Sequence, residues 1–186
     1  MPYKFRAITV SGKIAVGTTT LAKTLANTLK WKYVNVGALQ RKFDRTQHRN
    51  ENKQGALTRP DIHERSMEKM TFDMLQKDNN IIYEAWLSGF VSRNIPDVLR
   101  ILLICSHEDI RIDRVVNREN ITVEQAKKWM IQREAENETK WKKLYGDFNF
   151  WDPKFYHLVL DTYSSGPLQT AGKVLDALDY KGILQK

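Results

Sequence analysis

Short apolar runs alternate along the chain with segments of helical periodicity, and this alternation constrains the fold more than any other feature. The apolar runs cover residues 5–10, 33–36, 80–83, 99–105 and 156–160, and the periodic segments cover residues 19–30, 37–49, 61–77, 108–118, 123–145 and 167–180. Apolar residues predominate in every run, as they do in strands buried on both faces. Such alternation is typical of a three-layer α/β fold with a parallel sheet, here of five strands.

The segment 11–20, Ser-Gly-Lys-Ile-Ala-Val-Gly-Thr-Thr-Thr, directly follows the first run and opens the first helical segment. It fits the phosphate-binding pattern G-x-x-x-x-G-K-[ST] at Gly12, Gly17 and Thr19. In such a loop, successive N–H groups and the helix N-terminus bind phosphate oxygens, and the glycines allow close approach. The predicted nucleotide-binding residues are Gly12, Lys13, Ile14, Ala15, Val16, Gly17, Thr18, Thr19 and Thr20. A glycine-containing turn whose threonines cap a helix is the alternative that the loop alone leaves open.

The loop departs from the pattern at one position, because Thr18 stands where a lysine is expected, while Thr19 keeps the hydroxyl that binds Mg²⁺. Losing one preorganised donor to developing charge costs about 3–4 kcal/mol of transition-state stabilisation. Lys13 is the nearest cation in the sequence, and we hypothesise that it substitutes, within the chain or across a dimer. A solvated Lys13 is the alternative, and the sequence does not indicate the oligomeric state.

The charge favours a partner that carries phosphate groups. The net charge is +8 over 186 residues, and the basic residues are dispersed, so nucleotides are favoured over nucleic acid. The denser clusters at 41–49 and 111–118 fall on predicted helices, where solvated faces are expected. No run resembles a signal peptide or reaches membrane-spanning length, so we expect a cytoplasmic protein without a membrane partner. The single cysteine, Cys105, lies in an apolar run and is expected to be buried and unreactive.

Two segments are predicted to be additions to the α/β core. Residues 44–60 are polar and end at Pro60, which predicts a mobile loop. Residues 118–145 predict a long charged helix or helical hairpin, a kind of segment that often closes over a phosphate site. We see no linker composition, so residues 1–186 are expected to form one domain.

Several motifs together resemble a known family. They lie at residues 8–22, 31–43, 82–90, 110–119, 133–147 and 156–162, and the most specific are R-x-x-R-x-x-x-R-E in 111–119 and R-E-x-E-x-E-x-x-W-x-x-L-Y-G-D in 133–147. Over roughly residues 5–178 the chain resembles the cytidylate kinase-like nucleoside monophosphate kinases, closest to the archaeal type and its bacterial relatives. Some members of this group are similar in carrying threonine where the loop lysine is expected.

The resemblance implies a P-loop kinase fold with a helical acceptor-binding segment at about 37–78 and a helical lid at about 118–145. It implies that ATP and Mg²⁺ bind at the loop and that small-molecule nucleotides are the substrates. The residues that match the family's acceptor site are Gly37, Arg41 and Glu84, those that match its catalytic lid are Arg118 and Arg133, and those near its adenine site are Asp161 and Thr162. For each lid arginine alone, a surface ion pair is the alternative: Arg118 with Glu119, and Arg133 with Glu136.

The chain also departs from the family at Trp86, where the family commonly has an arginine that holds the acceptor. Arg59, Arg65 and Arg93 are candidate replacements. We therefore expect an ATP- and Mg²⁺-dependent kinase that phosphorylates a nucleoside monophosphate, CMP or dCMP first. The alternative is a catalytically weak nucleotide-binding protein that acts as a binding or assembly factor, with RNA as its partner.

Overall fold

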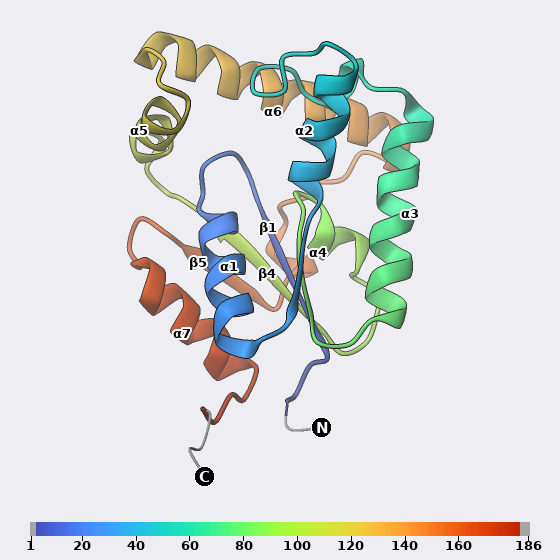
Figure 1. The fold of residues 1–186 in the computed structure, drawn as a ribbon, viewed down its shortest axis with the longest axis vertical. Helices are drawn as coiled ribbons and strands as arrows, with labels where there is room; N and C mark the ends of the chain where they lie inside the picture. Colours follow the sequence, from blue (N-terminus) through green and yellow to red (C-terminus); the bar gives the residue numbers. More distant parts are fainter. Residues whose placement is uncertain (1–2, 183–186) are drawn as a thin grey trace.

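The computed structural model describes residues 3–182 and has a parallel five-stranded sheet at its centre (Figure 1). The strands are β1 (Ala7–Gly12), β2 (Lys32–Asn35), β3 (Ile81–Glu84), β4 (Val98–Ile104) and β5 (Leu158–Asp161). Their order is β2-β3-β1-β4-β5, and every pair is parallel. The α/β fold predicted from the alternation of apolar runs is confirmed.

Helices cover both faces of the sheet, because successive residues of the central strand β1 point to opposite sides. Ile8 and Val10 pack with α1 (Thr18–Leu29) and α7 (Pro167–Ala177). On the other face, Ala7 packs in the cluster that includes Leu75 of α3 (Asp61–Lys77), and Ser11 bonds to Ser88 of α4 (Ser88–Val91). Three layers result, and all six residues of β1 are buried, as expected of a central strand that is covered on both faces.

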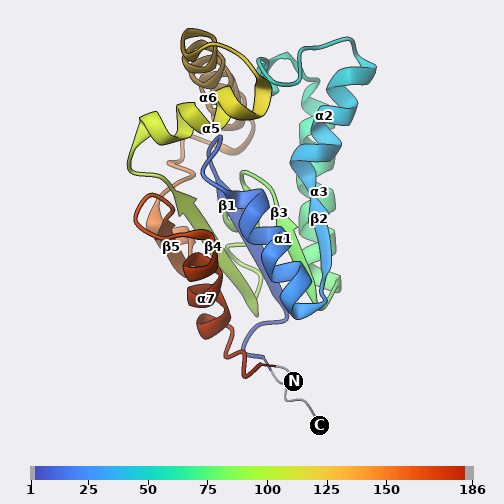
Figure 2. The ribbon, with the colours of Figure 1, turned by 60° about the vertical axis from the view of Figure 1, so that its left-hand side comes forward.

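The remaining helices lie toward the carboxyl ends of the strands. They are α2 (Val36–Thr46), α5 (Glu108–Glu119) and α6 (Val123–Tyr145), and Figures 1 and 2 show α5 and α6 packed together beyond the sheet. Two short 3₁₀ helices, Ala56–Thr58 and Pro153–Phe155, complete the structure. Helix α6 begins at a capping box formed by Thr122 and Gln125, which fixes its start where the sequence predicts it.

Several predictions about the elements need correction, including the helix predicted at 167–180, which ends at Ala177. Strand β1 extends through Gly12, because Ser11 and Gly12 still pair with β4. The helix predicted at 37–49 ends at Thr46, and His48 beyond it has a left-handed backbone, with φ of 54°. Helix α4 was not predicted, since four residues are too short to show a helical period.

The segment 44–60 is also not the loose loop that its polarity predicts. Asp44 lies in α2 and receives two hydrogen bonds from buried Arg59, at 2.9 and 2.6 Å. Gly55 and Ala56 donate their backbone N–H groups to side chains of α6. Asp44 and Arg59 therefore form a buried pair, and the backbone of Gly55 and Ala56 holds the segment against α6.

Cys105 is half-buried rather than buried, because β4 ends just before it. Within residues 3–182, no helix combines the length and the apolar character needed to cross a membrane.

Candidate functional site

The loop between β1 and α1 lies at the carboxyl edge of the sheet, where the chain connections reverse direction across β1. Ligands of open α/β sheets bind at such a position. Gly17 has φ of 95°, and Ala15 also lies in the left-handed region, with φ of 59°. A side chain on Gly12 would place its Cβ 2.5 Å from Val16 Cγ2 and 2.8 Å from the Leu103 carbonyl oxygen. The two predicted glycine requirements are therefore real, whereas the strained backbone at Ala15 has no signal in the sequence.

Helix α1 presents its N-terminus at this loop. Gly17 is the N-cap residue without a side-chain cap, and the first turn contains no acidic residue. The open N–H groups and the positive end of the helix dipole therefore suit an anion. Thr18 and Thr19 do not cap the helix, so the structure contradicts the alternative of a threonine-capped turn.

Glu84, at the end of β3, receives the hydroxyl groups of both threonines. Its Oε1 accepts hydrogen bonds from Thr18 at 2.9 Å and from Thr19 at 2.6 Å. Its Oε2 accepts from Asn35 at 2.7 Å and from the Tyr33 hydroxyl. Burial, together with the hydrogen bond to Glu84, raises the pKa of Tyr33. Glu84 therefore contacts the phosphate-binding loop directly, which the predicted acceptor role did not include.

A wide cavity opens above this loop. It has a volume of about 680 Å³, within the range of small-molecule sites. Its lining includes Gly17, Thr18, Thr19, Thr20, Arg41, Arg114, Arg118, Arg133 and Thr162. Thr162 lines this cavity as predicted, whereas Asp161 does not, and the side chain of Val16 packs in the core. The cations, the helix N-terminus and the Thr19 hydroxyl beside Glu84 fit the phosphates of a nucleotide and a Mg²⁺ ion.

Two arginines of α5 bind the backbone of the loop. Arg111 Nε donates to the Ile14 carbonyl at 2.9 Å, and Arg114 Nη1 donates to the Ala15 carbonyl at 2.9 Å. The prediction of a solvated basic face at 111–118 is therefore wrong for both. The three- and four-residue spacings in R-x-x-R-x-x-x-R place these side chains on one face of the helix, and that spacing was the available signal.

A smaller cavity, which we call the junction, lies between the loop and the end of β3. Its lining includes Gly12, Lys13, Ile14, Ala15, Thr18, Thr19, Gly37, Arg41, Glu84, Trp86, Arg118 and Arg133. The four cations that the sequence singles out, the loop and the predicted acceptor residues thus converge on one space.

Arg133, on α6, is the most unusual of these cations. Its side chain is 8% exposed, and its Nε has no hydrogen-bond partner in the part of the chain that the structure describes. Burial, together with the positive charges of Arg59, Arg41 and Arg118, lowers its pKa to about 10. The alternative pairing partner, Glu136, instead accepts the Gly55 N–H at 2.6 Å. Within residues 3–182, Arg133 therefore carries a buried positive charge that forms no ion pair.

Lys13 and Arg118 are both partly exposed and paired. Arg118 Nε lies 2.6 Å from Glu119 Oε1, which is the ion pair that the alternative interpretation expected. Lys13 Nζ lies 3.9 Å from Glu134 Oε2, and the same carboxylate accepts the Ile14 N–H at 3.3 Å. Glu134 thus connects α6 to the loop through the Ile14 N–H group and forms an ion pair with Lys13.

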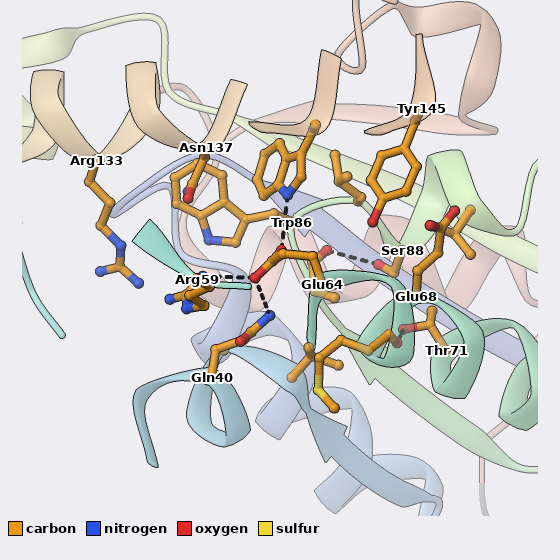
Figure 3. A pocket seen from close by; sticks show the side chains of 17 residues that line it. Gln40, Arg59, Glu64, Glu68, Thr71, Trp86, Ser88, Arg133, Asn137 and Tyr145 are labelled. Atoms are coloured by element: carbon orange, nitrogen blue, oxygen red, sulfur yellow. Dashed lines mark hydrogen bonds and ion pairs between the residues drawn. The ribbon is translucent and has the colours of Figure 1, made fainter. Parts of the chain in front are cut away.

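A third cavity, which the sequence did not predict, lies between α3 and α6 (Figure 3). We call it the aromatic cavity, and its lining includes Arg59, Glu64, Met67, Glu68, Thr71, Trp86, Leu87, Arg133, Trp141 and Tyr145. Trp86 packs edge-on against Trp141, with ring centres 5.6 Å apart. Of the candidate replacements for the missing arginine, Arg59 lines this cavity, while Arg93 stacks on Phe90 at 4.0 Å.

Comparison with known proteins agrees with this geometry. The sequence model of the cytidylate kinase-like family matches residues 7–164. A cytidylate kinase of Pyrococcus furiosus is 33% identical over 183 residues, which are 97% of this chain and 92% of the relative. An uncharacterised protein from Eubacterium ventriosum has a TM-score of 0.71 at 13% identity, over 95% of this chain and 99% of the other. A gluconokinase from Sinorhizobium meliloti has a TM-score of 0.61 at 10% identity, over 94% and 91%.

The two solved structures share the fold, which is that of the P-loop kinases. The family match covers the loop, the junction and both neighbouring cavities up to residue 164, and the sequence similarity extends over nearly the whole chain. The chain therefore belongs to the cytidylate kinase-like family.

Proposed function

We propose that this chain transfers the γ-phosphoryl group of ATP to a nucleoside monophosphate, with CMP or dCMP as the preferred acceptor. The observation that carries the proposal is the position of Arg133, which lines the wide cavity, the junction and the aromatic cavity. A buried cation that lacks an anion, placed where two ligand cavities meet, suits a phosphoryl group passing between them. Family membership makes the chain a nucleoside monophosphate kinase, and the relatives named cytidylate kinase support CMP as the acceptor.

The donor side is the wide cavity. The N–H groups of the loop 12–20 and the N-terminus of α1 bind the phosphates of ATP. The Thr19 hydroxyl, oriented by its hydrogen bond to Glu84, is the protein ligand for Mg²⁺. When bound, Mg²⁺ neutralises charge on the donor phosphates.

The acceptor side is formed by the segment 37–78, with the lid at 118–145 above it. Gly37 and Arg41 line the junction and receive the acceptor phosphate. An oxygen of that phosphate attacks the γ-phosphorus of ATP, and the bond from that phosphorus to the bridging oxygen breaks, so that ADP leaves. Arg118 and Arg133 neutralise the charge on the transferring group, because guanidinium groups stay charged and bind phosphate oxygens in pairs.

Arg133 is also the best-supported replacement for the missing loop lysine. Lys13 lines the junction, but its ammonium group is paired with Glu134, which competes with a phosphate for it. We assign Lys13 a secondary catalytic role and Arg133 the main one.

A coupled assay that follows ADP, with ATP, Mg²⁺ and a panel of CMP, dCMP, UMP, AMP and GMP, tests the proposal. Turnover that is fastest with CMP or dCMP is the expected result. ATP binding without turnover on any acceptor would reject the proposal. In that case, an affinity for RNA that falls steeply with salt would favour the binding-factor alternative.

A further inference from the structure

The aromatic cavity has two chemically different ends (Figure 3). Arg133 and Arg59 lie at one end, while Glu68, Thr71 and Tyr145 lie at the other. Arg133 also lines the junction, whereas Glu68 and Tyr145 line the aromatic cavity alone among the three. A nucleotide whose phosphate meets the arginines therefore extends its base toward Glu68.

The walls between these ends suit a flat ring. Trp86, Trp141, Met67 and Leu87 all line the cavity. Aromatic and thioether side chains pack well against the face of a heterocycle. Trp86 therefore supplies apolar surface to this cavity.

The two carboxylates of the cavity differ in their capacity to bind a ligand. Glu64 is 4% exposed, and its oxygens already accept from Gln40 and Arg59, each at 3.3 Å, and from Trp141 at 3.4 Å. These partners hold Glu64 in place and leave little of it accessible. Glu64 is therefore a structural part of the cavity wall rather than a group that hydrogen-bonds the ligand.

Glu68 is less constrained. It is half-buried on α3, and the Tyr145 hydroxyl is its hydrogen-bonding neighbour across the cavity. Burial raises the pKa of Glu68, and the hydrogen bond from Tyr145 and the charges of Arg65 and Arg93 offset part of that effect. The neighbouring Thr71 hydroxyl is already bonded to the Met67 carbonyl at 2.8 Å and to the Tyr83 hydroxyl at 2.9 Å. Glu68 is therefore the group at this end with acceptor capacity to offer a ligand.

We propose that Glu68 determines which base the acceptor carries, by accepting a hydrogen bond from an exocyclic amine of a pyrimidine. The inference rests on the proposed function and adds the chemical feature that the site selects. Cytosine presents an amine at C4, where uracil presents a carbonyl oxygen. An oxygen facing the carboxyl group of Glu68 repels it and leaves it without a donor, which is the kind of mismatch that sites reject strongly.

The test compares CMP with UMP, because the two bases are of similar size and differ in the group at C4 and in the proton that uracil carries on N3. Glu68→Gln keeps the side-chain volume but adds an amide donor that suits a carbonyl oxygen. The wild type is expected to prefer CMP by about 100-fold or more in kcat/KM, a ratio typical of hydrogen-bond selection. The variant is expected to lower that ratio at least tenfold, partly by a rise in kcat/KM for UMP. Asp73→Asn is the matched control, since Asp73 is on the same helix, pairs with Lys69 at 2.6 Å and lies outside the cavity.

A binding measurement separates this inference from the proposed function. CMP and UMP are titrated into each protein without ATP, and quenching of tryptophan fluorescence reports a base near Trp86 and Trp141. If the wild type phosphorylates CMP but Glu68→Gln leaves the ratio unchanged, the base-selecting role is wrong and the kinase activity stands. If no acceptor is phosphorylated, the proposed function is wrong. The titration then decides the role of Glu68 alone, and equal wild-type affinities for CMP and UMP would overturn it.

Discussion

Replacing Arg133 by methionine removes a guanidinium group that the fold buries without an anion. Methionine keeps an unbranched apolar stem of similar length, so the packing of α6 against the junction is largely retained. We expect opposite effects on stability and on catalysis. The variant gains stability in the absence of nucleotide and loses most of its phosphoryl-transfer rate.

The stability gain follows from the pKa of Arg133. Burial and the neighbouring cations lower that pKa from its ordinary value to about 10, so the charged form is disfavoured by roughly 3 kcal/mol, at about 1.4 kcal/mol per pKa unit. The folded protein binds this proton less tightly than the unfolded chain, so the penalty is present in full at neutral pH and disappears only as pH rises above about 10. Part of the gain is lost with the guanidinium's own contacts. We expect a net increase of about 1–2 kcal/mol in the free energy of unfolding.

The catalytic loss follows from the same charge. Removing one preorganised donor to a developing negative charge lowers kcat by about 10²–10³-fold. Urea unfolding at pH 7 without nucleotide measures the first effect, and the coupled assay with CMP measures the second. Arg118→Met is the matched control for stability, because Arg118 is 54% exposed and paired with Glu119, and its free energy of unfolding should change by less than about 0.5 kcal/mol.

Two results would refute this account of Arg133. A variant less stable than the wild type by more than about 1 kcal/mol shows that the side chain holds the fold together. A kcat within a few-fold of the wild type shows that another group neutralises the transferring phosphoryl. Adding Thr18→Lys to the Arg133→Met variant tests the catalytic role of Arg133 further. Partial recovery of kcat is expected only if Arg133 replaces the loop lysine in neutralising the transferring phosphoryl group.

Three further predictions concern the loop and its contacts. Glu84→Gln should lower the free energy of unfolding by about 1–3 kcal/mol, because the NH₂ group of the new amide would face side chains that are themselves hydrogen-bond donors. The same variant should need a higher Mg²⁺ concentration for half-maximal rate. An unchanged Mg²⁺ titration would contradict the role of Glu84 in orienting Thr19. Lys13→Ala should lower kcat by about tenfold or less, because the Lys13 ammonium group is already paired with Glu134. A loss of kcat as large as that of Arg133→Met would show that Lys13 contributes as much to catalysis as Arg133. Gly12→Ala should cost about 1–3 kcal/mol, measured by thermal unfolding, because the added Cβ meets Val16 and the Leu103 carbonyl, and an unchanged Tm would show that the loop relaxes around it.

Local patterns in the sequence predict the secondary structure well. Helices α3 and α6 begin and end at the predicted residues, because apolar periodicity and capping residues are properties of neighbouring positions. The five strands also lie where the apolar runs predict them, within two residues. The errors occur where long-range contacts override the local pattern. Polarity alone predicts a loose loop at 44–60, but Arg59 and Asp44 form a buried pair.

The candidate site was predictable in its residues but not in their environment. The loop motif identifies Thr19, and the resemblance to the cytidylate kinase-like family identifies Arg41, Arg118 and Arg133. Their convergence at the junction follows from the parallel sheet, since the carboxyl ends of its strands meet at one edge. That Arg133 forms no ion pair within residues 3–182 could not be inferred, because the charges that act on it, those of Arg59, Arg41, Arg118 and Asp44, come from residues distant in the chain.

The sequence by itself determined the order of strands and helices, the phosphate-binding loop and the absence of its lysine, because each depends on residues close together in the chain. The tertiary structure alone decided where Arg133 lies relative to the loop and that an aromatic cavity adjoins the junction. Thr18 donates to Glu84, 66 positions away, and the aromatic cavity forms only where α3, α6 and the segment after β3 meet. Contacts between residues so far apart in the sequence depend on how the helices pack around the sheet, and local periodicity carries no information about that packing.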